Sequence, residues 1–407
     1  MSEWKRYKLS DIASLSNGIN FDKSAYTSGV KLIGVADFKD RIYPDFNSLQ
    51  EVDPKVVRKG DYLEKGDIVF VRSNGNKELV GRCMMIDQDI PVTYSGFCIK
   101  LRLMDKNIFE PIFFNYLFRT RQFRKAMTGT AVGANIQNLS QSRLGNCKVC
   151  VPNIEKQREI ATILSRYDSL IENYQKQIKL LEEAAQRLYK EWFVDLRFPG
   201  HEHTKIVNGV PEGWEKKTIN DICTHISSGS TPSRRNKSYW ENGTIKWVKT
   251  KELLDGWIFD TEEYITDDGL KNSSTKIYPV NSILMAIYAS PTLGRLGILA
   301  SECCCNQAAL CLIANEQIIS WQWLYWKLFE LRDEFNAIAR GAGQQNISGI
   351  VVKNKEVLVP TKQVVDTFTN IANPIFESIK KISNQIRLLT EARDRLLPKL
   401  MSGEIAV

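Results

Sequence analysis

The stretch Gln177-Ile-Lys-Leu-Leu-Glu-Glu-Ala-Ala-Gln-Arg-Leu188 recurs, with most positions identical, as Gln385-Ile-Arg-Leu-Leu-Thr-Glu-Ala-Arg-Asp-Arg-Leu396, 208 residues further along the chain. A repeat offset by about half the length of a 407-residue chain indicates two equivalent halves. Each copy lies near the end of a long run in which apolar residues recur in steps of four and three. These two runs predict the two longest helices of the fold.

The apolar residues of the two runs form matching stripes. The first stripe consists of Ile160, Leu164, Tyr167, Ile171, Tyr174, Ile178, Leu181, Ala185, Leu188 and Trp192. The second, 208 residues later, consists of Phe368, Ala372, Ile375, Ile379, Ile382, Ile386, Leu389, Arg393, Leu396 and Leu400. A repeat of 3.5 residues is typical of a coiled-coil seam. Two independent helices packed on separate cores remain an alternative, but the matched register favours pairing.

A helix of about 38 residues is roughly 57 Å long, and intrinsic propensity alone would not hold it without a partner. Two features interrupt the second stripe: Arg393 places a charge on it, and Pro374 has no counterpart in the first run. Because proline removes a backbone hydrogen bond and clashes with the preceding turn, we predict a kink or a short first helix at this point.

Composition and charge limit the classes of protein to which the chain can belong. The chain is 43% hydrophobic and 25% charged, with no apolar run near 18 residues and an N-terminus without the apolar core of a signal peptide. Nine cysteines, including three in a row at 303–305, suit free thiols in a reducing compartment. We therefore expect a cytoplasmic protein without a membrane span. The net charge of +8 is uneven, since residues 1–150 carry +7 and residues 200–358 carry −1.

Similar anchors divide the chain into two halves. Trp214 follows Trp4 by 210 residues, and Val359-Pro360 follows Val151-Pro152 by 208. We predict an α+β fold with a pseudo-twofold internal repeat, in which two similar mixed α/β domains are joined by two long antiparallel coiled-coil helices. The expected boundaries are 1–151 for the first domain, 152–198 for the first helix, 199–359 for the second domain with a linker at 199–213, and 360–407 for the second helix and tail.

Local patterns predict elements within the first domain. Apolar β-type segments at 30–35, 67–71 and 96–101 are bounded by Gly and Asn clusters, and residues 110–127 have the pattern of one helix.

No catalytic constellation is found in the sequence. The chain lacks a phosphate-binding Gly-x4-Gly-Lys-Ser/Thr motif and contains no Pro-Pro pair, which excludes the Asn/Asp-Pro-Pro-aromatic motif of amino-methyltransferases. His201-Glu-His203 and Cys147-Lys-Val-Cys150 lack further metal ligands at a suitable spacing. We therefore predict no catalytic residue, metal or cofactor on this chain.

Polar and basic loops follow the predicted central strands. Arg, Lys, Asn and Gln are the usual side chains that contact DNA bases and phosphates, although each could also be a solvated loop residue. The candidate DNA-binding residues are Arg72, Ser73, Asn74, Asn76, Lys77, Arg82, Thr130, Asn135, Arg234, Arg235, Lys237, Tyr288, Ser290, Arg295, Gln344 and Gln345.

The segments that close the two long runs carry a family resemblance. They are Trp192-Phe-Val-Asp-Leu-Arg-Phe-Pro-Gly-His-Glu202 and Leu396-Leu-Pro-Lys-Leu-Met-Ser-Gly-Glu-Ile405, supported by Pro211-Glu-Gly-Trp214 and Asn346-Ile347. With these motifs the chain resembles the specificity (S) subunit of type I restriction-modification systems. The resemblance extends over the whole length.

This resemblance implies a non-catalytic subunit with two target-recognition domains, each reading one half of a bipartite target in double-stranded DNA. The helices would set the spacing between the half-sites and dock two methyltransferase subunits, which motor-nuclease subunits would join. S-adenosylmethionine, ATP and magnesium would belong to those partners. A coiled-coil scaffold whose two domains bind proteins is the alternative, and a self-sufficient DNA enzyme with unrecognised motifs is a third possibility.

Overall fold

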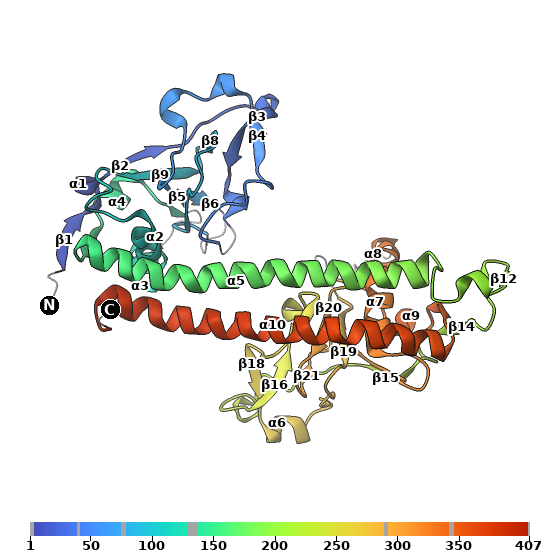
Figure 1. Cartoon of the computed structure of the whole chain (residues 1–407). Coiled ribbons are helices and arrows are strands. Elements are labelled where there is room, and N and C mark those ends of the chain that lie inside the picture. Colours follow the sequence, from blue (N-terminus) through green and yellow to red (C-terminus); the bar gives the residue numbers. More distant parts are fainter. Residues whose placement is uncertain are drawn as a thin grey trace. The chain divides into compact units, whose positions relative to one another are not determined.

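Two long helices, α5 (Ile154–Tyr189) and α10 (Lys362–Ser402), run through the fold (Figure 1). The computed structural model describes residues 4–38, 41–74, 79–128, 137–288, 292–341 and 346–405. All members of both apolar stripes are buried or half-buried. The predicted seam is therefore confirmed as a packed surface.

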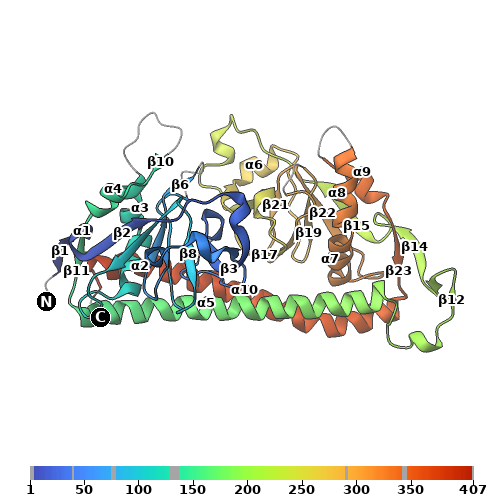
Figure 2. The same cartoon turned by 90° about the horizontal axis from the view of Figure 1, so that it is seen from above.

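The chain divides into two compact units, each of which contains part of both helices. Unit 1 consists of residues 1–172 and 388–407, and unit 2 of residues 173–387. In unit 1 the start of α5 shares a core with the end of α10, where Leu164 and Leu400 are both fully buried. In unit 2 the rings of Tyr189 and Trp192 lie 6.3 and 6.1 Å from that of Phe368 near the start of α10. Within each unit the two helix segments are therefore antiparallel, as predicted, and they lie side by side in both views (Figures 1 and 2).

Unit 1 contains a mixed α/β domain before α5. Its elements are β1 (Lys5–Lys8), α1 (Leu9–Ile12), β2 (Ala13–Asn17), β3 (Tyr26–Ile33), β4 (Gln50–Val52), β5 (Ile68–Val71), β6 (Ser73–Asn74), β7 (Cys83–Met85), β8 (Val92–Tyr94), β9 (Cys98–Leu103), α2 (Pro111–Arg119), α3 (Arg121–Thr128), β10 (Gln137–Asn138), α4 (Gln141–Gly145) and β11 (Lys148–Val151). The sheets have the strand orders β2-β9-β5-β7, β4-β3-β8, β1-β11 and β10-β6.

Unit 2 repeats this arrangement between the helices. Its elements are β12 (Ile206–Val207), β13 (Val210–Pro211), β14 (Glu215–Thr218), β15 (Cys223–Ser228), β16 (Ile245–Val248), β17 (Gly256–Ile258), β18 (Glu263–Ile265), α6 (Asp267–Lys271), β19 (Ile283–Ala286), β20 (Leu296–Leu299), β21 (Cys304–Cys305), β22 (Ala309–Ala314), α7 (Trp321–Glu330), α8 (Arg332–Gly341), α9 (Gly349–Lys353) and β23 (Glu356–Val359). The sheets are β15-β22-β19-β20-β17, β18-β16-β21, β14-β23 and β12-β13.

The two domains share one topology. The order β2-β9-β5-β7 corresponds to β15-β22-β19-β20, and β4-β3-β8 corresponds to β18-β16-β21, including the parallel pairing of the last two strands in each. The register matches as well, since Lys5 pairs with Val151 and Glu215 pairs with Val359. Strand β17, which extends the larger sheet of unit 2, is the main addition. The predicted internal repeat is confirmed.

Two sequence-based expectations about helices were wrong. Residues 110–127 form two helices, because Thr120 takes an extended ψ of 144° and its hydroxyl accepts a hydrogen bond from the amide of Phe123, which caps α3. The first long helix stops short of residue 198: α5 gives way to a π-helical turn (Lys190–Val194), and Leu196 then adopts a φ of 58°.

Helix α10 continues unbroken through Pro374, which excludes the short first helix that was one of the two outcomes predicted there. Ala372 and Phe376, on either side of it, are buried in the core of unit 2. This packing compensates for the missing backbone hydrogen bond.

Candidate nucleic-acid interface

Two of the predicted polar loops of unit 1 meet at a short two-stranded ladder, where the first loop begins and the second ends. Strand β6 pairs with β10, with Ser73 opposite Asn138, and the amide of Leu139 donates to the carbonyl of Arg72 at 2.8 Å. Residues 75–78 and 129–136, the bodies of both loops, lie outside the described residues. Residues 72–74 and 137–139, the described ends of these two sequence-distant loops, thus lie at the same place.

The turn between β8 and β9 joins this ladder. The amide of Arg72 donates to the carbonyl of Phe97 at 2.8 Å, and its guanidinium Nη1 donates to the carbonyl of Gly96 at 3.3 Å. The amide of Gly96 in turn donates to the carbonyl of Ile19 at 2.7 Å. Four chain segments therefore meet at one point, which we call the loop junction of unit 1: residues 18–20, 72–74, 95–97 and 137–139.

Unit 2 has the same junction. Tyr288 forms an isolated bridge with Asn346, and the amide of Ile347 donates to the carbonyl of Ile287 at 2.9 Å. The amide of Ile287 donates to the carbonyl of Ala308 at 2.9 Å, as Arg72 does to Phe97. The loop junction of unit 2 therefore consists of residues 229–231, 287–288, 306–308 and 346–347.

Glycine is required at the same place in both junctions. A Cβ on Gly18 would lie 2.2 Å from the carbonyl oxygen of Tyr94, and a Cβ on Gly229 would lie 2.1 Å from that of Cys305. Contacts below 3.0 Å are essentially never seen for real Cβ atoms. This close backbone approach fixes residues 18–20 in unit 1 and residues 229–231 in unit 2 against the neighbouring segment of their junction.

Arg82 and Arg295 occupy equivalent turns in the two units. Each follows a glycine with a φ of 76°, Gly81 or Gly294, and each donates its amide across the turn at 3.0 Å. Both arginines are half-buried. The structure thus places Arg82 directly before β7 and Arg295 directly before β20, where the chain leaves the polar loop and enters the next strand. The two positions are equivalent, as the repeat predicts.

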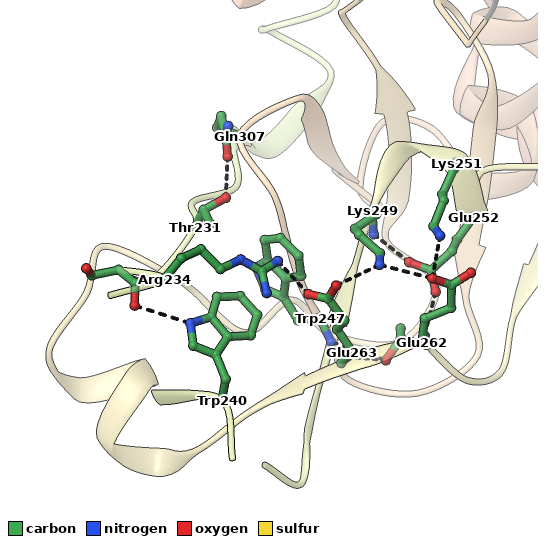
Figure 3. Close-up of polar contacts among 12 residues, drawn as sticks. Thr231, Arg234, Trp240, Trp247, Lys249, Lys251, Glu252, Glu262, Glu263 and Gln307 are labelled. Atoms are coloured by element: carbon green, nitrogen blue, oxygen red, sulfur yellow. Dashed lines mark hydrogen bonds and ion pairs between the residues drawn. The ribbon is translucent and has the colours of Figure 1, made fainter. Parts of the chain in front are cut away.

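Arg234 lies in a different setting from its neighbours (Figure 3). Its guanidinium carbon is 3.6 Å from the ring centre of Trp240 and 5.0 Å from that of Trp247, and Nη2 pairs with the carboxylate of Glu263. Both indole N–H groups are satisfied, by the carbonyls of Ser233 and Ser230. Arg234 is therefore engaged in local structure, whereas the side chains of Arg235 and Lys237 are exposed and make no ion pair or hydrogen bond within the described residues.

A charged network continues from this stack. Lys249 Nζ contacts Glu263 at 2.9 Å and Glu262 at 3.0 Å, and the hydrogen bond to Glu263 raises the pKa of Lys249. Burial raises the pKa of Glu263, but hydrogen bonds from Lys249 and Arg234 outweigh it, so that the net shift is downward. The network keeps Glu263 ionised and orders the loop that carries Arg235 and Lys237. On the opposite side of the same loop, Thr231 donates to Gln307 of the junction (Figure 3).

The remaining candidate residues cannot be compared with the structure. They are Asn76, Lys77, Thr130, Asn135, Ser290, Gln344 and Gln345, which lie outside the described residues. Of Asn74, the backbone pairing to Gln137 is described.

Sequence reasoning missed two features of the junctions. Phe97 is 62% exposed, and an apolar residue inside a strand-like run carries no sequence signal that its side chain faces water. Gln307 follows the three cysteines at 303–305, where no motif marks it.

The described ranges contain no group of three His, Cys, Asp or Glu side chains that could hold a metal ion. Within the same ranges, helices long and apolar enough to cross a membrane are absent.

Two equivalent junctions on one topology, carrying different side chains, define a modular recognition protein. The type I restriction modification DNA specificity domain matches residues 1–183 and 211–388, and the chain belongs to this family.

Named relatives and a solved structure agree with this assignment. The chain is 29% identical to the MjaIX specificity subunit of Methanocaldococcus jannaschii over 297 residues, which cover 72% of this chain and 68% of the relative. It is 25% identical to the HindI specificity subunit of Haemophilus influenzae over the full length of both. Its fold is similar to that of the type I restriction-modification S subunit of M. genitalium, with a TM-score of 0.62 at 17% identity, covering 98% of this chain and 96% of that one.

Proposed function

We propose that this chain is the DNA sequence-recognition subunit of a type I restriction-modification enzyme and has no catalytic activity itself. Residues 1–151 and 199–359 would each read one half of a bipartite target in double-stranded DNA. The observation that carries this proposal is the pair of equivalent loop junctions with different side chains. A shared frame with different contact residues is what two modules that read different sequences require.

The side chains at the junctions differ in ways that matter for base readout. Unit 1 presents Ser73 and Phe97 where unit 2 presents Tyr288 and Ala308. We propose that Arg72, Ser73, Asn74, Asn76, Lys77, Arg82, Thr130 and Asn135 contact one half-site, and that Arg234, Arg235, Lys237, Tyr288, Ser290, Arg295, Gln344 and Gln345 serve the other. Arg234 would act by positioning its loop, since its guanidinium is already bound to Glu263.

The helices supply the spacing. Helix α5 has 36 residues and α10 has 41, which correspond to about 54 and 62 Å. Half-sites one helical turn of DNA apart need about 34 Å between recognition elements. We propose that the helix pair sets this distance and docks two methyltransferase subunits, joined by motor-nuclease subunits in the cytoplasm. S-adenosylmethionine, ATP and magnesium would be bound by those partners.

A domain exchange tests the proposal. Residues 1–151 are replaced by the corresponding domain of a relative with a different target, and the methylated motif is mapped in cells that express the complex. We expect one half of the motif to change and the other half and the spacing to stay. A change of both halves, or of neither, would exclude the modular assignment.

Two further measurements separate the alternatives. The complex with its methyltransferase should bind its target with strong salt dependence, because phosphate contacts release counterions; absence of DNA binding at low salt would favour a protein scaffold. The isolated chain, incubated with DNA, magnesium and S-adenosylmethionine, should give no methylated product. Turnover by the isolated chain would exclude the proposal that it has no catalytic activity.

A further inference from the structure

Exposed aromatic side chains are few in the described chain, and they are not scattered. The aromatic residues among the exposed large hydrophobic side chains are Tyr26, Phe97 and Tyr288, with exposed fractions of 47%, 62% and 41%. Two of these three lie in the loop junctions, one in each unit. Apolar rings left in water on an otherwise polar surface often mark a contact site.

Phe97 is held on a rigid base. Its carbonyl accepts hydrogen bonds from the amides of Arg72 at 2.8 Å and Ser73 at 3.4 Å, and its neighbour Cys98 is fully buried. The amide of Cys98 also closes the turn onto Ser95 at 2.9 Å. The backbone of Phe97 is thus fixed from both sides, while its ring faces water.

Tyr288 is held in the corresponding way in unit 2. It bridges Asn346, and its carbonyl accepts a hydrogen bond from the hydroxyl of Thr292 at 3.2 Å. The residue equivalent to Phe97 is Ala308, and the residue equivalent to Tyr288 is Ser73. Each junction therefore carries one large ring and one small residue, at exchanged positions.

The surroundings of the rings favour a nucleic acid over an apolar protein surface. Beside Phe97 lies the guanidinium of Arg72, which is bonded to the carbonyl of Gly96, and the amide of Ser73 contacts the Phe97 carbonyl. Beside Tyr288 lies Asn346, and the same junction carries the exposed Gln307, whose amide oxygen accepts from Thr231. A flat ring set among cationic and amide groups matches the flat face of a base, flanked by hydrogen-bonding edges and phosphates.

We infer that Phe97 and Tyr288 stack on, or insert between, base pairs of the DNA, one ring in each half-site. This inference rests on the proposed DNA recognition and extends it, because it assigns a deformation of the duplex to a single side chain in each unit. Apolar wedges of this kind partly unstack a base step, and the cost depends on the sequence of that step. Each ring would thus add sequence preference without a hydrogen bond to a base.

The test uses the complex with its methyltransferase subunits and target duplexes that carry 2-aminopurine at successive positions of each half-site. Unstacking raises the fluorescence of this base analogue. We expect one position in one half-site to become bright with the wild-type chain and to stay dark with Phe97→Ala, and the other half-site to respond to Tyr288→Ala. Loss of one base–aromatic stack should weaken binding about 5- to 150-fold, whereas Phe97→Trp should restore both the binding and the signal.

Two controls address general effects of truncation. Tyr26→Ala removes the third exposed ring, and Met104→Ala removes a side chain that is 64% exposed at the far end of β9. Both should leave DNA affinity and fluorescence unchanged.

The outcomes separate this inference from the function on which it rests. If Phe97→Ala binds within twofold of wild type with the same bright position, the stacking role is excluded while DNA recognition stands. If Phe97→Ala instead impairs assembly with the methyltransferase, the ring is a protein contact and the inference is likewise overturned. If the wild-type complex does not distinguish target from random DNA, the proposed function itself fails.

Discussion

Asp168 and Arg393 form an ion pair inside the helix pair of unit 1. Their side chains are only 16% and 14% exposed, and the hydroxyl of Tyr116 donates to the other carboxylate oxygen of Asp168 at 2.6 Å. Arg393 is the charged member of the second apolar stripe, and its partner lies next to the first stripe rather than on it. Burial lowers the pKa of Arg393, but the carboxylate of Asp168 outweighs it and the net shift is upward.

The equivalent place in unit 2 is apolar. Phe376 follows Asp168 by 208 residues, and Ala185 precedes Arg393 by the same number. Phe376 is 3% exposed and packs its ring 5.0 Å from that of Trp321, while Ala185 is fully buried. The equivalent buried site between the helices is therefore occupied by an ion pair in unit 1 and by an aromatic ring in unit 2.

This contrast predicts the effect of breaking the pair. Asp168→Ala leaves the guanidinium of Arg393 buried with only Asp394 as a carboxylate partner, so we expect the free energy of unfolding of unit 1 to fall by about 3–5 kcal/mol. The double variant Asp168→Phe with Arg393→Ala, which copies the residues of unit 2, should lose much less. Chemical denaturation of the three proteins measures the difference. Equal losses in the single and double variants would show that volume rather than charge decides stability there.

The sequence was sufficient to predict the frame of the fold, because the frame depends on periodicity and on the repeat. Ile160 and Phe368 could be assigned to buried stripes from spacing alone, and the structure confirms both. The approach of Arg72 to Phe97 could not be predicted, because it depends on hydrogen bonds between segments far apart in the sequence. For the same reason a list of basic residues could not distinguish Arg234, which is bound by Trp240 and Glu263, from Arg235.

The two junction glycines should not tolerate a side chain. In Gly18→Ala and Gly229→Ala the added methyl would meet carbonyl oxygens at 2.2 and 2.1 Å, and since these belong to the backbone, the strands beside them must shift. We expect each variant to be destabilised by about 1–3 kcal/mol or more. Gly60→Ala is the matched control, because nothing lies within 4 Å of its Cβ position. Thermal unfolding compares the three, and an unchanged midpoint in Gly18→Ala would contradict the close approach seen here.

Truncation of the adjacent residues Arg234 and Arg235 should affect the stability of the folded chain differently. Arg234→Ala removes the stack on Trp240 and the pair with Glu263, so we expect a loss of about 1 kcal/mol of stability at this half-exposed position. Arg235→Ala should change stability by less than about 0.5 kcal/mol. If Arg235 contacts a phosphate, the Arg235→Ala variant should also show a lower slope of DNA affinity against salt concentration, by about one counterion. Denaturation and a salt titration of DNA affinity measure both, and a stability loss as large in Arg235→Ala would contradict the distinction.

The stability of unit 2 should depend on the protonation of Glu182. This carboxyl lines a cavity of about 270 Å³ together with Asp255, Trp257 and Tyr325, and it makes no hydrogen bond or ion pair within the described chain. Burial, and after it the charge of Asp255, raise the pKa of Glu182 above its ordinary value. The folded chain therefore holds this proton more tightly than the unfolded chain does. As pH rises from the ordinary glutamate range, near about 4.3, through the raised folded-state pKa, the unfolded state ionises first and stability falls.

Glu182→Gln cannot ionise, so its stability should lack this decrease. We expect the variant to match the stability of the wild-type chain at pH values below the ordinary glutamate pKa. Above the raised folded-state pKa of Glu182, at neutral pH, the variant should be more stable. Urea denaturation at a series of pH values between about 4 and 7 measures the difference between the two proteins. The low-pH points serve as the internal control for any effect of the substitution on packing, since glutamine and protonated glutamic acid have nearly the same shape. A difference that stays constant over this range, or that favours the wild-type chain at neutral pH, would show that the carboxylate has a partner when the chain is folded.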